Sequence, residues 1–405
     1  MLVPLDEARA HVLNRIPGPL DTVLLPAVEA VGSVAAEPIV ATEPVPPFAN
    51  SAMDGYAVRS ADTLTAPVAL REVATTLAGS VNTAAVGPGQ AVRIMTGAPV
   101  PDGADAIVPV EVVERGVESV RIAHPVPAGQ HVRPAGDDIK PGDVVMTAGT
   151  VITPVHLGVL ASLGVAKVAV VRRPRVGVLS TGDELVGGDA PLLEGQIRDS
   201  NRATLLALIA AAGAEPVDLG LVGDDQELIT TTLLDAVTRC DAVLTSGGVS
   251  MGDVDLIRVV LDLIGEMRWM QVAIKPAKPF AFGMVDGVPV FGLPGNPVSS
   301  VVSFELFARP ALRRLAGHVE GHLDRPCPTA IAVDGLSRPK DGKLHFVRVV
   351  CSVNSKGQLE ARSVGARGSH QLAAAAAANG LAILPDGEGS QPGGLVDVLL
   401  VGDLQ

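Results

Sequence analysis

The chain has 405 residues and a formal net charge of −13. It is too long for one ordinary hydrophobic core, so we expect about two to four domains. The acidic balance argues against general nucleic-acid binding, because neutralising phosphates requires a basic face. Three cysteines, Cys240, Cys327 and Cys351, are too few and too widely spaced for a disulfide framework or a zinc site.

The N-terminus carries acidic residues and lacks an unbroken apolar region, so it does not resemble a signal peptide. No apolar run approaches the roughly 20 residues of a membrane span. We therefore expect a cytoplasmic protein that binds neither membranes nor nucleic acid. Aromatic residues make up only 2% of the chain, so the core must consist mainly of aliphatic side chains.

The pattern over residues 4–16 predicts a short amphipathic helix. At residue 44 the composition changes to PVPPFANSAMDGYAV, in which prolines are followed by strong turn formers. Such a loop presents Asp54 on a rigid support. A plain crossing between domains is the alternative interpretation of this loop.

Residues 57–132 show short alternating strands separated by Gly and Pro, which predicts a small antiparallel β-unit. Thr96 follows one of these strands and either offers its hydroxyl to a ligand or serves as a turn residue. Asp138 follows Gly136, where a carboxylate either faces a metal–phosphate site or lies in a solvated turn. Residues 152–167 have helical spacing, and we expect this helix to pack against the N-terminal one.

From residue 173 strands alternate with helices, which predicts a doubly wound, mainly parallel sheet. After Pro310 the pattern returns to β-type runs, interrupted by an alanine-rich helix that ends at Asn379-Gly380. We therefore predict a multidomain α/β protein. Its expected parts are an N-terminal helical and linker domain (1–43 with 134–172), an inserted β domain (44–133), a central α/β domain (173–322) and a C-terminal β domain (323–405).

The stretch 243–300 carries the strongest functional signal. Two apolar runs end in the loops Ser246-Gly247-Gly248 and Pro294-Gly295-Asn296. Parallel sheets gather such loops at the carboxyl ends of their strands, where free backbone N–H groups favour an oxyanion. Lys275 and Lys278 add two positive charges between these loops. The sequence therefore predicts an anion-binding site.

Eight motifs occur in the order seen in the molybdopterin molybdenumtransferase family, which includes the bacterial MoeA proteins and the E domain of gephyrin. They are PPFANSAMDGYAV, RIMTGAPVPDGADAIVP, AGDDIKPGDVV, STGDEL, GQIRDSN, TSGGVSMGDVD, IKPAKPFAFG and LPGNPVS. The resemblance covers essentially the whole chain. Two small departures are Ala277, where many relatives have Gly, and Met251-Gly252-Asp253, where others have Val-Gly-Glu.

The resemblance implies a reaction in which adenylylated molybdopterin and molybdate give the molybdenum cofactor and AMP, assisted by Mg²⁺. Glu184 and Asp255 are the implied metal ligands, with Asp183 and Asp253 as weaker alternatives. Asp199 is a further candidate for catalysis, although it also fits a helix N-cap. The other implied catalytic residues are Asp54, Thr96, Asp138, Lys275 and Lys278.

The implied binding residues fall into two groups. The substrate and its phosphates would contact the loop residues Ser180, Thr181, Gly182, Ser246, Gly247, Gly248, Val249, Ser250, Pro294, Gly295, Asn296 and Pro297. Molybdate would contact Lys275, Lys278, Arg348 and Ser369. An arginine with its forked donors and a hydroxyl suit a tetrahedral oxyanion.

The family also implies a homodimer in which the inserted β domain reaches the active site of the other protomer, bringing Asp54 and Thr96 to it. An upstream adenylyltransferase is a candidate partner for substrate delivery. Two alternatives remain for the chain itself, namely the sister activity of molybdopterin adenylylation and a non-catalytic scaffold of the gephyrin kind.

Overall fold

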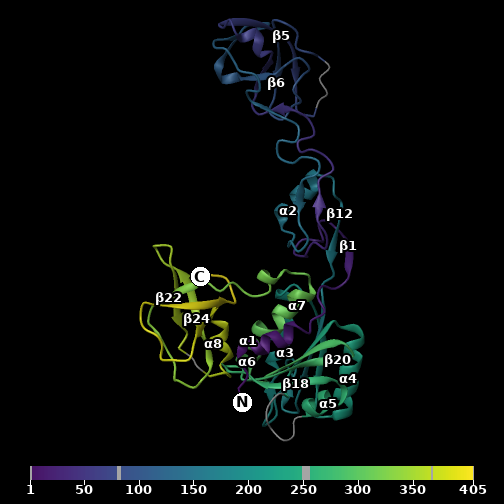
Figure 1. The fold of residues 1–405 in the computed structure, drawn as a ribbon, viewed down its shortest axis with the longest axis vertical. Coiled ribbons are helices and arrows are strands. Elements are labelled where there is room, and N and C mark those ends of the chain that lie inside the picture. Colours follow the sequence, from purple (N-terminus) through teal and green to yellow (C-terminus); the bar gives the residue numbers. More distant parts are fainter. Residues whose placement is uncertain (1, 80–83, 249–255, 366–367, 405) are drawn as a thin grey trace.

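The computed structural model describes residues 2–79, 84–248, 256–365 and 368–404. The molecule is elongated, with an α/β domain and a β-barrel side by side at one end and a slender arm that projects to the other (Figure 1). Within the described ranges, no helix combines the length and the apolar character needed to cross a membrane. Val249, Ser250, Asp253 and Asp255, all named above, lie outside the described residues.

The central domain is built on a six-stranded sheet with the strand order β16-β13-β17-β21-β20-β18. β16, β13, β17 and β21 are parallel, whereas β20 and β18 are antiparallel to their neighbours, which confirms the predicted mainly parallel α/β fold. The strands are β13 (Arg175–Thr181), β16 (Glu215–Val222), β17 (Ala242–Ser246), β18 (Glu266–Gln271), β20 (Pro279–Val285) and β21 (Val288–Leu293).

Helices cover both faces of this sheet, each above a separate aliphatic core. One face packs against α3 (Ser200–Ala211), α6 (Pro297–Ser303) and α7 (Arg309–Leu315), with a π-helical turn at Phe304–Ala308 between the last two. The other face packs against α4 (Gln226–Arg239) and α5 (Leu256–Ile264). Two short strands, β14 (Leu185–Val186) and β15 (Ile197–Arg198), pair beside the sheet.

The N-terminal helix α1 (Leu5–Leu13) corrects two expectations. Its buried Ala8 and Val12 belong to the core of the central domain, and the backbone N–H of Val3 donates to the carbonyl of Gln271. The helix therefore packs neither in the N-terminal linker domain nor against α2 (Pro154–Ser162). The physical reason is that its apolar face is covered by α7 and the adjoining π-helical turn.

The linker region is mostly extended rather than helical. The α-helix that its described residues form is α2. Two antiparallel strand pairs surround that helix. They are β1 (Thr22–Pro26) with β12 (Lys167–Val171) and β2 (Ile39–Val40) with β11 (Val144–Met146). Aliphatic side chains from both pairs pack on α2 and form a small core of their own.

The arm carries a second six-stranded sheet, with the order β7-β4-β6-β5-β9-β8. The sheet is mixed rather than purely antiparallel, because β5 and β6 run parallel and the chain between them must cross back. Its strands are β4 (Gly55–Val58), β5 (Val68–Thr76), β6 (Gln90–Ile94), β7 (Ala106–Pro109), β8 (Val113–Arg115) and β9 (Ser119–Ile122). The pair β3 (Asn50–Ser51) and β10 (Val132–Arg133) joins it to the linker, and short 3₁₀ turns span Ser60–Thr63 and Val110–Val112.

The C-terminal domain is a closed barrel, since β24 pairs with both β25 and β26 and the remaining strands complete the ring. Its strands are β22 (Thr329–Ala332), β24 (Leu344–Val353), β25 (Leu359–Ser363), β26 (Gly380–Leu384) and β28 (Gly394–Leu400). A side pair joins β23 (Leu336–Ser337) to β27 (Gly389–Ser390), and a 3₁₀ turn (Glu320–His322) leads in from the central domain. The alanine-rich helix α8 (Leu372–Ala376) is shorter than predicted, because Asn379 turns inward and bonds to the backbone of Cys351 on β24.

Candidate functional site: an anion-binding edge and a cationic cavity

Three loops converge at the carboxyl edge of the central sheet, as the sequence predicted for a parallel arrangement. They follow β13, β17 and β21, and the backbone N–H of Gly247 donates to the carbonyl of Leu293 at 3.2 Å. A Cβ on Gly247 would come within 3.3 Å of the Thr181 carbonyl oxygen, and the φ of 98° at this position favours glycine. The described loop residues gathered here are Ser180, Thr181, Gly182, Ser246, Gly247, Gly248, Pro294, Gly295, Asn296 and Pro297.

Asn201 ties these loops together, and the sequence reasoning did not single it out as a site residue. Its amide nitrogen donates to Ser246 Oγ at 2.8 Å and to the Gly295 carbonyl at 2.7 Å. The side chain is largely buried at the start of α3. Its position in IRDSN, two residues after the helix cap Asp199, was the available signal, but the sequence does not show which loops the amide meets.

The two predicted carboxylates on this edge have different environments. Asp199 is the N-cap of α3, and its side chain, 1% exposed, accepts hydrogen bonds from Ser180 Oγ and from the backbone N–H and Nε of Arg202. The exposed Glu184 has no hydrogen bond or ion pair to its carboxylate within the described part of the chain. That carboxylate lies against Gly182, where an added Cβ would come within 2.3 Å of it. Glu184 is thus the carboxylate that remains available to a ligand.

Asp183, the weaker candidate for a metal ligand, has a hydrogen-bond partner. Its Oδ1 accepts a hydrogen bond from the backbone N–H of Asp224 at 2.9 Å. It therefore fastens the loop after β16 to the loop after β13. Among the described residues, no group of three or more His, Cys, Asp or Glu side chains is arranged to hold a metal ion by itself.

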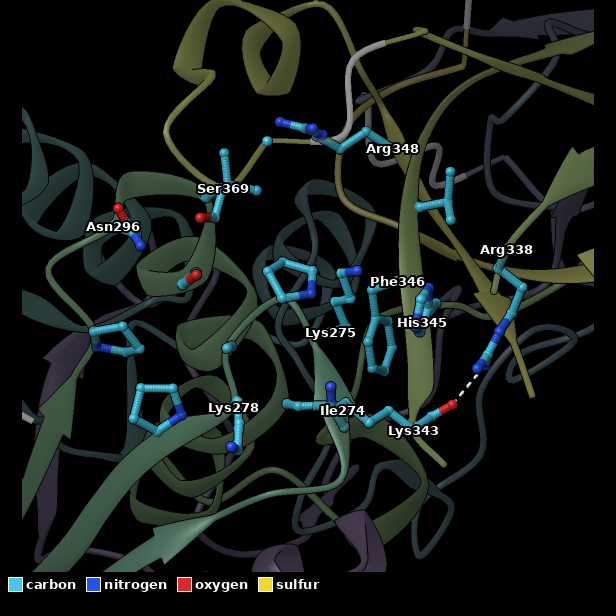
Figure 2. Close-up of a pocket in the computed structure, with 18 of the residues that line it drawn as sticks. Ile274, Lys275, Lys278, Asn296, Arg338, Lys343, His345, Phe346, Arg348 and Ser369 are labelled. Carbon is cyan, nitrogen blue, oxygen red and sulfur yellow. Dashed lines mark hydrogen bonds between the residues drawn. The ribbon is translucent and has the colours of Figure 1, made fainter. Parts of the chain in front are cut away.

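A cavity of about 490 Å³ lies between the central domain and the barrel (Figure 2). It brings together all four residues that the resemblance assigns to molybdate, namely Lys275, Lys278, Arg348 and Ser369. In the view of Figure 2 the amine of Lys275 points toward Ser369, whereas that of Lys278 points away from it. Pro294 and Asn296 line the same cavity, so the loop 294–296 borders both the cavity and the sheet edge.

The loop that carries both lysines is joined to the barrel. β19 (Ile274–Lys275) pairs in parallel with β24, with Lys275 opposite His345. Ala277, at the centre of the loop, is buried and has a φ of 73°, a left-handed conformation that glycine adopts without strain. This conformation explains why glycine suits the position in the relatives that the sequence resembles.

The barrel side of the cavity holds residues that sequence reasoning missed. Arg338, Lys343, His345 and Phe346 all line it. The buried guanidinium of Arg338 donates to the carbonyls of Pro339, Lys343 and Leu384 and to two aspartates. The basic run in SRPKDGKLHF was the available signal, but such a run in isolation is typical of a solvated turn.

Burial shapes the electrostatics of this wall. Desolvation lowers the pKa of Arg348, which is 5% exposed and donates to the Gln371 carbonyl at 3.1 Å. The cavity lining contains lysine and arginine side chains and no carboxylate among the described residues. Such a lining stabilises a multiply charged anion and excludes cations.

Three other predicted residues lie away from this region. Asp54 and Thr96 meet each other on the exposed surface of the arm, where both the backbone N–H and the hydroxyl of Thr96 donate to Asp54 Oδ1 at 2.7 Å. These bonds lower the pKa of Asp54. Asp138 lies at the base of the arm, where its backbone N–H donates to the Val45 carbonyl. In one chain the arm extends away from the central sheet (Figure 1).

Fold and site together define a multidomain α/β protein in which a cavity lined by lysine and arginine side chains lies between the central domain and a barrel. Three family descriptions match successive regions: "MoeA N-terminal region (domain I and II)" over residues 3–164, "Probable molybdopterin binding domain" over 177–314 and "MoeA C-terminal region (domain IV)" over 336–401.

Individual relatives agree with these matches. The chain is 40% identical to a molybdopterin molybdenumtransferase of Haemophilus influenzae over 97% of both chains. It is 39% identical to molybdopterin molybdenumtransferase 2 of Mycobacterium tuberculosis over 90% of this chain and 91% of that one. A crystal structure of the molybdopterin biosynthesis moeA protein of Pyrococcus horikoshii superimposes with a TM-score of 0.85 at 32% identity, covering 99% of this chain and 100% of the other. The chain therefore belongs to the molybdopterin molybdenumtransferase family, a family of transferases in molybdenum cofactor biosynthesis.

Proposed function

We propose that this protein inserts molybdenum from molybdate into adenylylated molybdopterin and releases AMP. The observation that carries the proposal is the cavity shared by Lys275, Lys278, Arg348 and Ser369. Molybdate is a tetrahedral dianion, and three cationic side chains with a hydroxyl supply the charge and the donors that it needs.

The two anion-binding regions divide the substrates between them. The loops after β13, β17 and β21 would hold the adenylylated pterin through backbone N–H groups and the Ser246 hydroxyl. The loop 294–296 borders both regions. A pterin held at the sheet edge would therefore have its dithiolene close to an oxyanion in the cavity. Holding both reactants in this way converts a bimolecular reaction into a step between two groups that are already positioned next to each other.

Glu184 and Asp255 would hold Mg²⁺. Glu184 fits this role because its carboxylate is exposed and has no partner in the described ranges, and Mg²⁺ prefers carboxylate oxygens together with phosphate and water. Asp255 lies outside the described residues. The ion, when bound, would offset the negative charge that develops as the pyrophosphate is cleaved.

The working form is proposed to be a homodimer with composite sites. Asp54 and Thr96 form a rigid, exposed pair on an arm that extends away from its own sheet edge (Figure 1). A two-fold axis would bring that pair to the partner's site. We expect the dimer to work in the cytoplasm and to receive its substrate from an upstream adenylyltransferase.

The test is a release assay. Purified protein, adenylylated molybdopterin, molybdate and Mg²⁺ should yield AMP and molybdenum cofactor, and omission of molybdate should abolish both. A parallel reaction with molybdopterin, ATP and Mg²⁺ identifies the sister activity, because only an adenylyltransferase forms the adenylylated product there. Absence of both products would leave the scaffold as the function and overturn the transferase proposal.

A further inference from the structure

His345 lines the cavity and forms a hydrogen-bonded pair with Asp341, whose carboxylate lies outside the lining. The Asp341 oxygens lie 3.0 Å and 3.1 Å from His345 Nε2. His345 is 6% exposed, and it lines the cavity beside Lys275, its register partner (Figure 2). Asp341 is itself held in place, because Arg338 Nη2 donates to it at 2.9 Å.

This contact determines which ring nitrogen carries the proton. A carboxylate accepts hydrogen bonds, so Nε2 is the protonated nitrogen, and Nδ1 of the neutral ring is an acceptor. No residue in the described part of the chain donates to Nδ1. The lysines and Arg348 that line the cavity are hydrogen-bond donors, so the neutral ring of His345 supplies an acceptor that these groups lack.

Burial is the largest influence on the pKa of His345, and it favours the neutral ring. Burial lowers its pKa, the Asp341 hydrogen bond raises it, and the positive charges of Arg338 and Lys275 lower it again. Lys343 stands on the same loop as Asp341 and is 3.4 Å from it, and Asp386 beyond β26 pairs with Arg338. When a dianion neutralises Lys275, one of the charges that oppose protonation of the ring is removed.

We propose that His345, oriented by Asp341, relays protons from the dithiolene thiols to the oxo group that leaves molybdate as water. This inference rests on the proposed function. Molybdate and a dithiol give a dithiolene-bound trioxomolybdenum dianion and one water: two S–H bonds and one Mo–O bond break, and two Mo–S bonds and two O–H bonds form. Molybdenum keeps its oxidation state, and no further reactant is required.

His345 suits this role better than its neighbours. A neutral imidazole accepts a thiol proton at Nδ1, and the resulting imidazolium is stabilised by Asp341 before it protonates the departing oxygen. Lysine and arginine side chains act as hydrogen-bond donors without an acceptor, and a serine hydroxyl is a far weaker base than an imidazole. Because the Mo–S bonds form on the bound molybdate, the thiols and the leaving oxygen must both enter the cavity that His345 lines.

The experiment separates molybdate binding from molybdenum insertion. His345→Gln, His345→Ala and Asp341→Asn are compared with wild type, with His124→Gln, an exposed change in the arm, as the matched control. We expect calorimetric molybdate affinity to stay within about threefold of wild type while the single-turnover insertion rate of His345→Gln falls about 100-fold or more. Added imidazole should restore part of the His345→Ala rate, and His124→Gln should behave as wild type.

Asp341→Asn tests the positioning role. It should keep the ring but change the pH dependence of insertion, and nitrogen NMR should show loss of the Nε2–H tautomer. An unchanged rate and pH profile in His345→Gln would overturn the relay, and so would a rate loss fully explained by weaker molybdate binding. Wild-type protein that binds molybdate but never inserts it would overturn the proposed function and the relay with it.

Discussion

Lys275 and His345 are register partners across the junction of two domains, because β19 of the central domain pairs in parallel with β24 of the barrel. The backbone N–H of Leu344 also donates to the Ala273 carbonyl at 2.8 Å. The loop that supplies Lys275 and Lys278 is thus fixed by backbone hydrogen bonds to the barrel. The barrel is therefore a structural part of the cationic cavity and not an appended module.

Replacing Lys275 with alanine should weaken molybdate binding at least tenfold, or about 1.4 kcal/mol. The side chain is exposed to the cavity, so the thermal midpoint should stay near wild type. Equilibrium dialysis with molybdate gives the affinity, and Lys356→Ala, an exposed change in the turn between β24 and β25, is the control. Equal affinities in the two variants would remove Lys275 from the oxyanion site.

Asn201→Ala should lower both stability and activity. It leaves the Gly295 carbonyl and the Ser246 hydroxyl without their donor, and such losses cost about 1–3 kcal/mol. Thermal melts and the AMP release assay measure the two effects. Asn14→Ala, an exposed amide at the end of α1, should change stability by less than about 0.5 kcal/mol. Identical melts for both variants would contradict the proposed role of the amide.

The loops at the sheet edge could be predicted because parallel strands bring their carboxyl ends together whatever else surrounds them. Ser246, Gly247 and the loop 294–296 therefore met as expected. The position of α1 could not be predicted in this way. An apolar helical face shows that a helix is buried but not which core receives it, and here the central domain does.

The barrel wall of the cavity was hidden from sequence reasoning for a related reason. Arg338, Asp341 and His345 lie within eight positions of one another, and their chemistry depends on a closed barrel that buries Arg338 and His345. Along the sequence the same residues are typical of a polar turn. The parallel pairing of β5 with β6 likewise depends on a crossover that the alternating pattern does not record.

Substitutions of Glu184 and Asp199 should distinguish a loss of activity from a loss of stability. Glu184→Gln is expected to melt near wild type and to lose at least about tenfold in AMP release, because its carboxylate has no structural partner in the described ranges. Asp199→Asn weakens a buried ion pair with Arg202 and alters an N-cap, so its thermal midpoint should fall. A wild-type rate for Glu184→Gln at every Mg²⁺ concentration would remove it from the metal site.

His318 should make the protein sensitive to mild acid. Burial lowers its pKa to about 4, and the charges of Arg313 and Arg309 act in the same direction. The unfolded chain therefore binds more protons between about pH 4 and 6.5. The stability contributed by the neutral ring is fully present above pH 6.5 and is lost as the pH falls toward 4.

Thermal midpoints at pH 7.5 and pH 5 measure this effect. The difference between them should be smaller in His318→Gln than in wild type, while the exposed His124→Gln should keep the wild-type difference. If His318→Gln shows the wild-type difference, the acid sensitivity arises from other groups.

Complementation tests whether the arm serves the partner's site. Asp54→Ala and Lys275→Ala should each be inactive alone, since one lacks the arm carboxylate and the other lacks a cavity lysine. In a mixed dimer one site receives the intact arm and the intact cavity, so the heterodimer should recover up to about half of the wild-type specific activity. Joining differently tagged chains and purifying through both tags isolates that species.

The double variant Asp54→Ala/Lys275→Ala paired with wild type is the matched control. If the arm crosses to the partner, each site of this dimer has one defective half, so the dimer should be inactive. If the arm serves its own chain, the wild-type chain keeps one intact site, so the dimer should be half active. The two pairings must therefore give opposite results, and activity in the control alone would show that each arm folds back on its own sheet.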